Sequence, residues 1–268
     1  MTSIPLTPSD ARQLTTATTS NTRWFEQLQL WRPKAVDQIT TGNHETAVIL
    51  LAGTFDLMAG ATSWPARGAR KTPFAGRPMA VFLPPNTPFR VGNDAVDGEI
   101  LMVSARQPDA GPEPEGKAAL SHKPLLPMAG SNKSFDPTTG EWMPAESFPS
   151  AAESLPPRRF EKLQVGDVKI ERVFGESYKA ATISLEEAVI PAGASLSLKD
   201  IPSRPRCDEV LLFVRPEGKS RIEQGSTSTE IDHDTTHCLS SEDVEQVTVH
   251  SDATATYVVI AYAGKTKA

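Results

Sequence analysis

The chain has 268 residues, of which 38% are hydrophobic and 22% charged, and its formal net charge is −6. This length suits one large β unit or two domains of ordinary size, and the composition is typical of a water-soluble protein. The negative net charge gives no electrostatic reason to expect nucleic acid as a partner. The longest apolar run, near Val48–Ala52, is far too short to span a membrane.

The two cysteines and the N-terminal residues indicate where in the cell the protein is expected. The chain has two cysteines, Cys207 and Cys238, which could form one disulfide. Because no apolar stretch near the N-terminus resembles a signal peptide, we expect two reduced thiols and a cytoplasmic protein.

The first part of the chain predicts an arm followed by a β unit. Residues 1–22 are rich in Ser, Thr and Pro and predict a tail or an extended arm. Large apolar and polar residues alternate from Trp24 to Trp31, as in a half-buried strand. The run Thr46–Gly53, its continuation Thr54–Met58 and the later Met79–Pro85 predict a strand, a Gly turn, a second strand and a strand ended by two prolines. We place this first domain at residues 23–106.

Residues 107–159 differ from the segments on either side of them. They contain "QPDAGPEPEG" and "SFPSAAESLPPRR", whose Pro, Gly and acidic residues are typical of a linker. Fifty irregular residues are too many for a loop inside one compact domain. This segment either crosses between two domains or wraps one domain and contributes short strands, and we expect it to cross.

Residues 160–268 predict a second β unit. "VGDVKIERVF" alternates in polarity, and "ATISLEEAVIPAGASLSL" gives two strands separated by a turn at Pro191–Gly193. "EVLLFV" is an apolar strand, and "VEQVTVHSDATATYVVIAYAG" predicts a hairpin that bends at Ser251–Ala253. The 23 prolines and 17 glycines of the chain argue against long helices.

Two stretches of the first unit also resemble a known family. "ETAVILLAGTFDL" and "WPARGARKTPFAGRPMAVFLPPNTPFRV" are similar to the N-terminal half of the 5-deoxy-glucuronate isomerase family, the relatives of 5-keto-4-deoxyuronate isomerase. The similar region runs from about Trp24 to Ala105. The resemblance implies a bicupin, and the two units share a layout that fits a duplicated jelly roll. The expected fold is therefore all-β, with two double-stranded β-helix (jelly-roll) barrels.

The resemblance implies a divalent metal in the C-terminal barrel, and this chain matches one of its ligands. The family has a His-x-His pair after a turn like Pro191–Gly193, then a Glu and a late His. Glu209 matches the Glu, whereas Gln246 falls near the late His. One carboxylate does not make a tight metal site, so we assign no metal ligand and leave the cofactor unknown.

Basic residues stand where the family has its histidine pair. Lys199, Arg204 and Arg206 would repel a metal but could bind the carboxylate of a sugar acid. We predict these three as substrate-binding residues and Glu209 as the acid that moves a proton. The alternative is a solvated loop whose charges face water.

A relocated metal site is a further alternative. His233, His237, Cys207 and His250 supply imidazole and thiolate groups, although the segment around them has the polar pattern of a loop.

The resemblance implies aldose–ketose isomerisation of a sugar acid in inositol catabolism. The alternative is a metal-free bicupin that binds a small anionic ligand or a protein partner without catalysis. A sugar acid is the expected small-molecule partner, neither nucleic acid nor membrane is expected, and homo-oligomerisation is left open.

Overall fold

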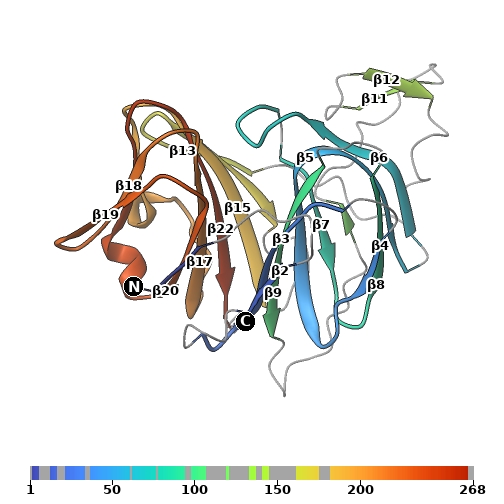
Figure 1. Ribbon diagram of the computed structural model, residues 1–268, viewed down its shortest axis with the longest axis horizontal. Coiled ribbons are helices and arrows are strands. Elements are labelled where there is room, and N and C mark those ends of the chain that lie inside the picture. The colour runs from blue at the N-terminus through green and yellow to red at the C-terminus, as the bar shows by residue number, and fades with distance from the viewer. Residues whose placement is uncertain are drawn as a thin grey trace.

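The computed structural model describes residues 2–5, 13–16, 22–33, 37–60, 62–76, 78–93, 98–106, 119–120, 133–136, 141–144, 161–174 and 182–264. Strands dominate these residues and form two barrels that lie side by side (Figure 1). This arrangement confirms the predicted all-β bicupin. None of the helices in the described part of the chain has the length and apolar character needed to cross a membrane.

The first barrel is built around one long strand. Its larger sheet has the order β10-β7-β5-β9-β3-β2. The strands are β10 (Ala119–Leu120), β7 (Ala80–Leu83), β5 (His44–Ala59), β9 (Glu99–Arg106), β3 (Phe25–Trp31) and β2 (Gln13–Thr16). The later half of β5 pairs with β6 (Thr62–Arg70) and β8 (Pro88–Asn93), and β8 pairs with β4 (Asp37–Thr40).

The second barrel has a seven-stranded and a four-stranded sheet. The larger sheet contains, in spatial order, β1 (Thr2–Pro5), β20 (Thr235–Ser240), β17 (Glu209–Pro216), β22 (Thr256–Ala263), β15 (Ile183–Ile190), β14 (Val168–Phe174) and β13 (Glu161–Val165). The smaller sheet contains β16 (Ser195–Ser197), β21 (Val247–Ser251), β18 (Ser220–Gln224) and β19 (Thr227–Ile231). Two short 3-10 helices, η4 (Leu198–Asp200) and η5 (Asp243–Gln246), accompany them.

The two barrels share one strand order, so the internal similarity predicted from the sequence extends to the topology. Spatial order β7-β5-β9-β3-β2 in the first barrel corresponds to β20-β17-β22-β15-β14 in the second. At the edges, β10 pairs with β7 and β1 pairs with β20. The first residues of the chain therefore add a strand to the second barrel.

Two local predictions were wrong. Gly53 does not end a strand, because β5 continues through it with shifts in register on either side. Its φ is +94°, and a Cβ there would lie 2.7 Å from Cα of Gly98, so the position requires glycine. Ser251–Ala253 does not join a hairpin either, because β21 and β22 belong to different sheets.

The segment predicted to cross between the domains lies mostly outside the described residues. Within 107–159 the structure describes β10 and a separate two-stranded ribbon of β11 (Lys133–Asp136) and β12 (Glu141–Pro144).

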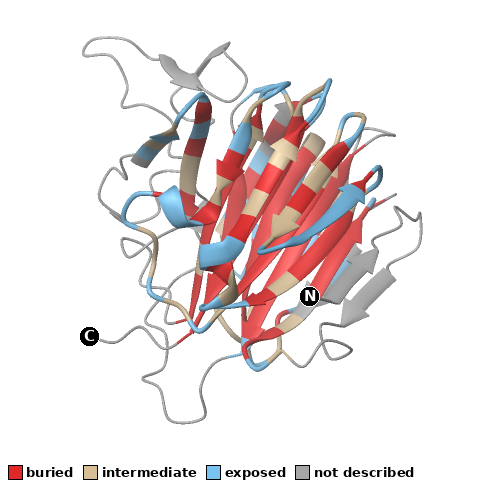
Figure 2. Cartoon of the chain, turned by 90° about the vertical axis from the view of Figure 1, so that its left-hand side faces the viewer, coloured by how far each residue is buried: buried red, intermediate tan, exposed pale blue. Residues whose placement is uncertain are grey.

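The larger sheets of the two barrels pack face to face, so their central strands are buried on both sides. In β17, Val210 and Leu212 point into the second barrel, whereas Leu211 and Phe213 point toward the first. Both faces of a strand in such a layer need apolar side chains, which explains the unbroken apolar runs in the sequence. The outer sheet instead mixes buried with exposed positions (Figure 2).

Two glutamates connect the barrels at one end of this interface. The fully buried Glu45, near the start of β5, accepts hydrogen bonds from the backbone N–H groups of Thr182 (2.8 Å) and Ile183 (3.1 Å) at the start of β15. Glu209, at the start of β17, accepts from the backbone N–H groups of Trp24 and Phe25 at the start of β3. Because β5 and β17 correspond, as do β3 and β15, the two contacts are reciprocal.

The Glu45 contact predicts a loss of stability when its carboxylate is removed. Glu45→Ala leaves two buried N–H groups without their acceptor and should lower the free energy of unfolding by about 3 kcal/mol. The exposed Glu217 offers a control, since Glu217→Ala should change it by no more than about 0.5 kcal/mol. Urea denaturation measures both variants, and an E45A midpoint equal to that of the wild type would contradict this role.

Candidate functional site

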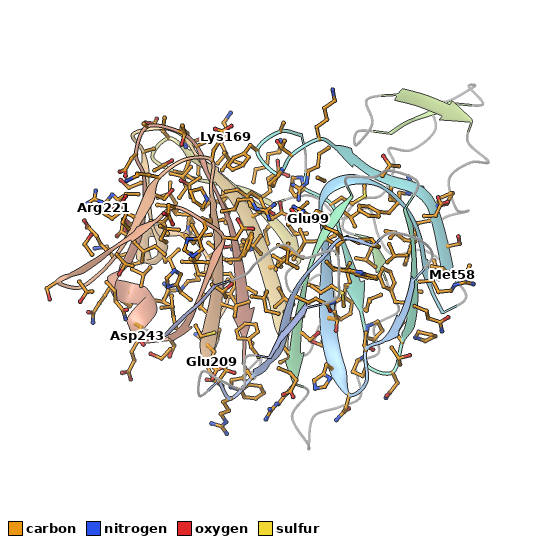
Figure 3. The ribbon with its side chains drawn as sticks, in the orientation of Figure 1. Met58, Glu99, Lys169, Glu209, Arg221 and Asp243 are labelled. Carbon is orange, nitrogen blue, oxygen red and sulfur yellow. The ribbon has the colours of Figure 1, made fainter. Side chains whose placement is uncertain are left out.

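Glu209 does not face the interior of the second barrel. Its position in β17 puts its side chain on the same face as Leu211 and Phe213, toward the first barrel. Its oxygens accept hydrogen bonds from backbone N–H groups of Arg23 (2.5 Å), Trp24 (2.9 Å) and Phe25 (3.4 Å), at the lower end of the interface in Figure 3. This corrects the expectation that Glu209 is an acid directed into a barrel pocket, because its oxygens already bind the chain that enters β3.

The three predicted substrate-binding cations lie in the loop around η4. Lys199 and Arg206 are exposed. Arg204 donates to the carbonyl oxygen of Leu198 at 3.2 Å and forms an ion pair with Glu245. No hydrogen bond or ion pair in the described part of the chain joins these cations to Glu209. The structure therefore does not bring the four predicted residues together.

The second barrel has a polar cluster that the sequence analysis missed. Glu186 is fully buried and points inward with Ala188 and Ile190. Its Oε1 accepts from Arg172 Nε (2.8 Å) and Nη2 (2.7 Å), and its Oε2 accepts from the Tyr262 hydroxyl (2.6 Å). Burial is the main cause that raises the pKa of Tyr262 well above its ordinary value. Both carboxylate oxygens are used, which indicates a structural role.

The barrel interiors do not fit the metal that the resembled family implies. The core of the first barrel is apolar, and that of the second is largely aliphatic, with residues such as Val210, Leu212 and Ile260. Among the described residues, no three His, Cys, Asp or Glu side chains gather in a way that could hold a metal ion. The donor set thus disagrees with the family, and no chemical step is assigned to a metal.

The alternative ligands are also dispersed. His233 is exposed and contacts Asp232, and His250 contacts Glu223 on the outside of the barrel. His237 is buried and lies opposite Leu212, which faces the barrel interior. Burial raises the pKa of the Cys207 thiol to about 11, which disfavours the thiolate that binds metals. Cys207 and Cys238 form no disulfide.

The buried His237 predicts a dependence of stability on pH. Burial lowers its pKa from 6.5 to about 4, so the unfolded chain binds the proton more readily than the folded one. The contribution of the neutral His237 side chain to the stability of the fold is complete above about pH 6.5 and is lost as the pH falls toward 4. When the pH is lowered from 7 to 5, the free energy of unfolding of His237→Leu should therefore rise by about 2 kcal/mol relative to that of the wild type. Urea denaturation at the two pH values measures this difference. An equal pH dependence of both proteins would contradict this.

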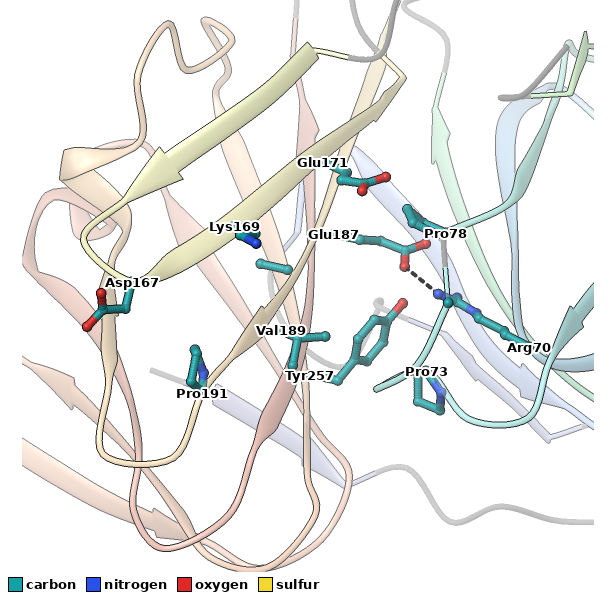
Figure 4. Close-up of a pocket in the computed structure, with 12 residues that line it drawn as sticks. Arg70, Pro73, Pro78, Asp167, Lys169, Glu171, Glu187, Val189, Pro191 and Tyr257 are labelled. Carbon is teal, nitrogen blue, oxygen red and sulfur yellow. Dashed lines mark hydrogen bonds and ion pairs between the residues drawn. The ribbon is translucent and has the colours of Figure 1, made fainter. Parts of the chain in front are cut away.

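A pocket of about 320 Å³ opens beside the interface between the barrels (Figure 4). β6 and the segment after it supply one wall, and β14, β15 and β22 supply the other. Its rim contains exposed residues, among them Asp167 and Lys169. The lining residues are Arg70, Pro73, Gly76, Pro78, Asp167, Lys169, Glu171, Glu187, Ala188, Val189, Pro191 and Tyr257.

Three buried polar side chains form the floor of this pocket. Arg70 and Glu187 form an ion pair across the interface at 3.0 Å, with side chains only 4% and 3% exposed. Arg70 Nε also donates to the carbonyl oxygen of Leu50 at 2.6 Å, and its guanidinium lies 5.7 Å from the Tyr257 ring centre. Arg70 Nη2, Glu187 Oε1 and the Tyr257 hydroxyl each lack a partner with full hydrogen-bond geometry within the described ranges, although the hydroxyl lies near both charged side chains.

Arg70 stays charged and the Tyr257 hydroxyl stays neutral at the floor near pH 7. Although burial opposes the charge of Arg70, the neighbouring Glu187 carboxylate raises the pKa of its guanidinium. Burial and the same carboxylate raise the pKa of the Tyr257 hydroxyl well above its ordinary value. The floor thus presents a cation, a neutral hydroxyl and a carboxylate that holds the cation in place.

Sequence reasoning missed this pocket because its residues come from distant segments. One signal was present: Glu186–Glu187 lies inside an otherwise apolar strand. Since neighbouring residues point to opposite faces of a strand, two adjacent buried acids need two separate sets of partners. Glu186 finds them inside the barrel and Glu187 between the barrels.

Comparison with known proteins supports the bicupin fold and finds a family model that matches the first barrel. The KduI/IolB family model matches residues 9–119, which include both stretches quoted above. The resemblance predicted from the sequence is therefore confirmed over this part of the chain. A search of the curated proteins finds no significant match.

Solved structures are similar over nearly the whole chain. An IolB-like protein from Salmonella typhimurium LT2 is 15% identical with a TM-score of 0.67, over 97% of this chain and 92% of that one. Oxalate decarboxylase from Bacillus subtilis is 9% identical with a TM-score of 0.57, over 99% and 78%. AerE from Microcystis aeruginosa is 12% identical with a TM-score of 0.52, over 95% and 97%. At these identities the similarities establish the bicupin fold alone.

Proposed function

We propose that this protein binds a sugar acid and does so without the metal centre of the family that it resembles. The KduI/IolB match over residues 9–119 is the observation that supports the substrate class. The largely aliphatic interior of the second barrel supports the second part, because the residues that point into it, such as Val210 and Leu212, cannot bind a metal.

Isomerisation of the sugar acid is the second candidate function, and the family match favours it. An aldose–ketose isomerase moves a proton from the carbon beside the carbonyl to the carbonyl carbon, while the hydroxyl proton of that neighbouring carbon passes to the carbonyl oxygen. This requires a carboxylate or another base within hydrogen-bond distance of that proton. Glu187 is the carboxylate with a free oxygen at the pocket floor, and it is the residue that an active enzyme would use.

Titration calorimetry with D-glucuronate tests the binding proposal. Protein dialysed against EDTA and protein supplied with Mn²⁺ or Zn²⁺ should bind the sugar acid with the same affinity. A complete absence of binding at millimolar sugar acid would contradict the substrate class. Binding that appears only after a metal is added would contradict the metal-free site.

Incubation with 5-deoxy-D-glucuronate tests catalysis separately. Proton NMR should show the ketose product if the chain is an isomerase, and unchanged substrate if it only binds. Glu187→Gln should abolish any turnover that is found, since the amide cannot accept the proton.

Glu209→Ala decides the role of the acid predicted from the sequence. The contacts of Glu209 with backbone N–H groups lead us to expect a loss of about 1–3 kcal/mol in the free energy of unfolding. The affinity for D-glucuronate should stay at the wild-type value. A folded E209A variant that no longer binds would instead identify Glu209 as part of the ligand site.

A further inference from the structure

The floor of the pocket between the barrels contains polar atoms that folding leaves unsatisfied. Arg70 Nη2 is a donor, Glu187 Oε1 is an acceptor, and the Tyr257 hydroxyl can act as either. A buried polar atom without a partner is costly, and such atoms are rare unless a ligand, water or function accounts for them. The described residues contain 14 such atoms, and these three are gathered at one cavity from both barrels (Figure 4).

The pocket wall divides into a polar floor and a mixed rim. Pro73, Pro78 and Val189 add apolar surface beside the floor. At the rim, the side chain of Lys169 forms no ion pair or hydrogen bond within the described residues. Small-molecule sites have this composition: apolar walls, a few convergent polar groups and a position between domains.

We propose that this pocket is the sugar-acid site, with ligand hydroxyl groups on Arg70, Glu187 and Tyr257 and the ligand carboxylate at Lys169. The assignment rests on the proposed function for the class of ligand. The location and the roles of the four residues rest on the geometry of the pocket.

Neighbouring hydroxyl groups match the floor because each can donate and accept. One hydroxyl can accept from Arg70 Nη2 and donate to Glu187 Oε1, and its neighbour can bond to the Tyr257 hydroxyl. These floor atoms expose almost no surface. Binding therefore requires a small side-chain adjustment, of the kind that is common when partners bind.

The charged residues at the rim determine which ligand charge the pocket favours. Lys169 is the cation available for a carboxylate, but Asp167 and Glu171 also line the pocket. These acids oppose a second negative charge, so a sugar with one carboxylate should bind better than a sugar phosphate.

Tyr257→Phe is the sharpest test because it removes one hydroxyl that lacks a partner with full hydrogen-bond geometry among the described residues. The variant should be as stable as the wild type or more so, since an unsatisfied buried group is removed. Its affinity for D-glucuronate, measured by calorimetry, should fall about three- to tenfold because one hydrogen bond to the ligand is lost.

Tyr262→Phe is the matched control on the same strand. Tyr262 is equally buried, but its hydroxyl donates to Glu186 inside the barrel. This variant should be less stable than the wild type and should bind D-glucuronate with unchanged affinity. The two tyrosine variants thus show opposite effects on stability and binding.

Lys169→Met tests the position of the carboxylate. The affinity for D-glucuronate should fall about two- to fivefold, whereas any affinity for D-glucose, which lacks the carboxylate, should not change. Lys219→Met is the control, because Lys219 is exposed and pairs with Glu230. It should leave both affinities unchanged.

The outcomes separate this assignment from the proposed function. If the wild type binds D-glucuronate and neither Y257F nor K169M weakens it, the protein binds sugar acids elsewhere and the pocket assignment is overturned. Loss of binding in Lys199→Met or Arg206→Ala would then locate the site at the η4 loop. If the wild type binds no sugar acid, the proposed function and the assignment both fail.

Discussion

The packing of the two larger sheets against each other is the constraint on which the rest of the structure depends. Strands such as β17 and β22 bury one face in their own barrel and the other against the neighbouring barrel. A polar group on the face that packs against the other barrel must therefore find a partner across the interface. Glu45, Glu209 and Glu187 all do so, with backbone N–H groups or with Arg70.

Because of this packing, the chain can have the bicupin fold without the metal site of the family that it resembles. Glu209 is the residue that the sequence predicts to match a family metal ligand, and its side chain lies on the interface face and binds the start of β3. Among the described residues the barrel interiors are filled mostly with apolar side chains, which stabilise the fold, and the carboxylate inside the second barrel, Glu186, is already bound by an arginine and a tyrosine. Three of the buried polar atoms left without partners lie at the edge of the interface, where Arg70, Glu187 and Tyr257 face a cavity.

The fold was largely predictable from the sequence, whereas the site was not. Short apolar runs bounded by Pro and Gly gave β15, β16 and β17 nearly at their observed bounds. The sequence predicts a turn at Gly53, where the structure has a bulge, because a glycine within a strand pattern can indicate either feature. The pocket could not be predicted, since Arg70 and Glu187 are 117 residues apart and only the docking of the barrels brings them together.

A crystal structure of the protein soaked with D-glucuronate tests the central claim most directly, because it shows which surface the ligand occupies. The account predicts electron density for the sugar between the barrels, with hydroxyl groups near Arg70, Glu187 and Tyr257 and the carboxylate near Lys169. Density for the sugar inside either barrel, or beside Lys199 and Arg206, would contradict it.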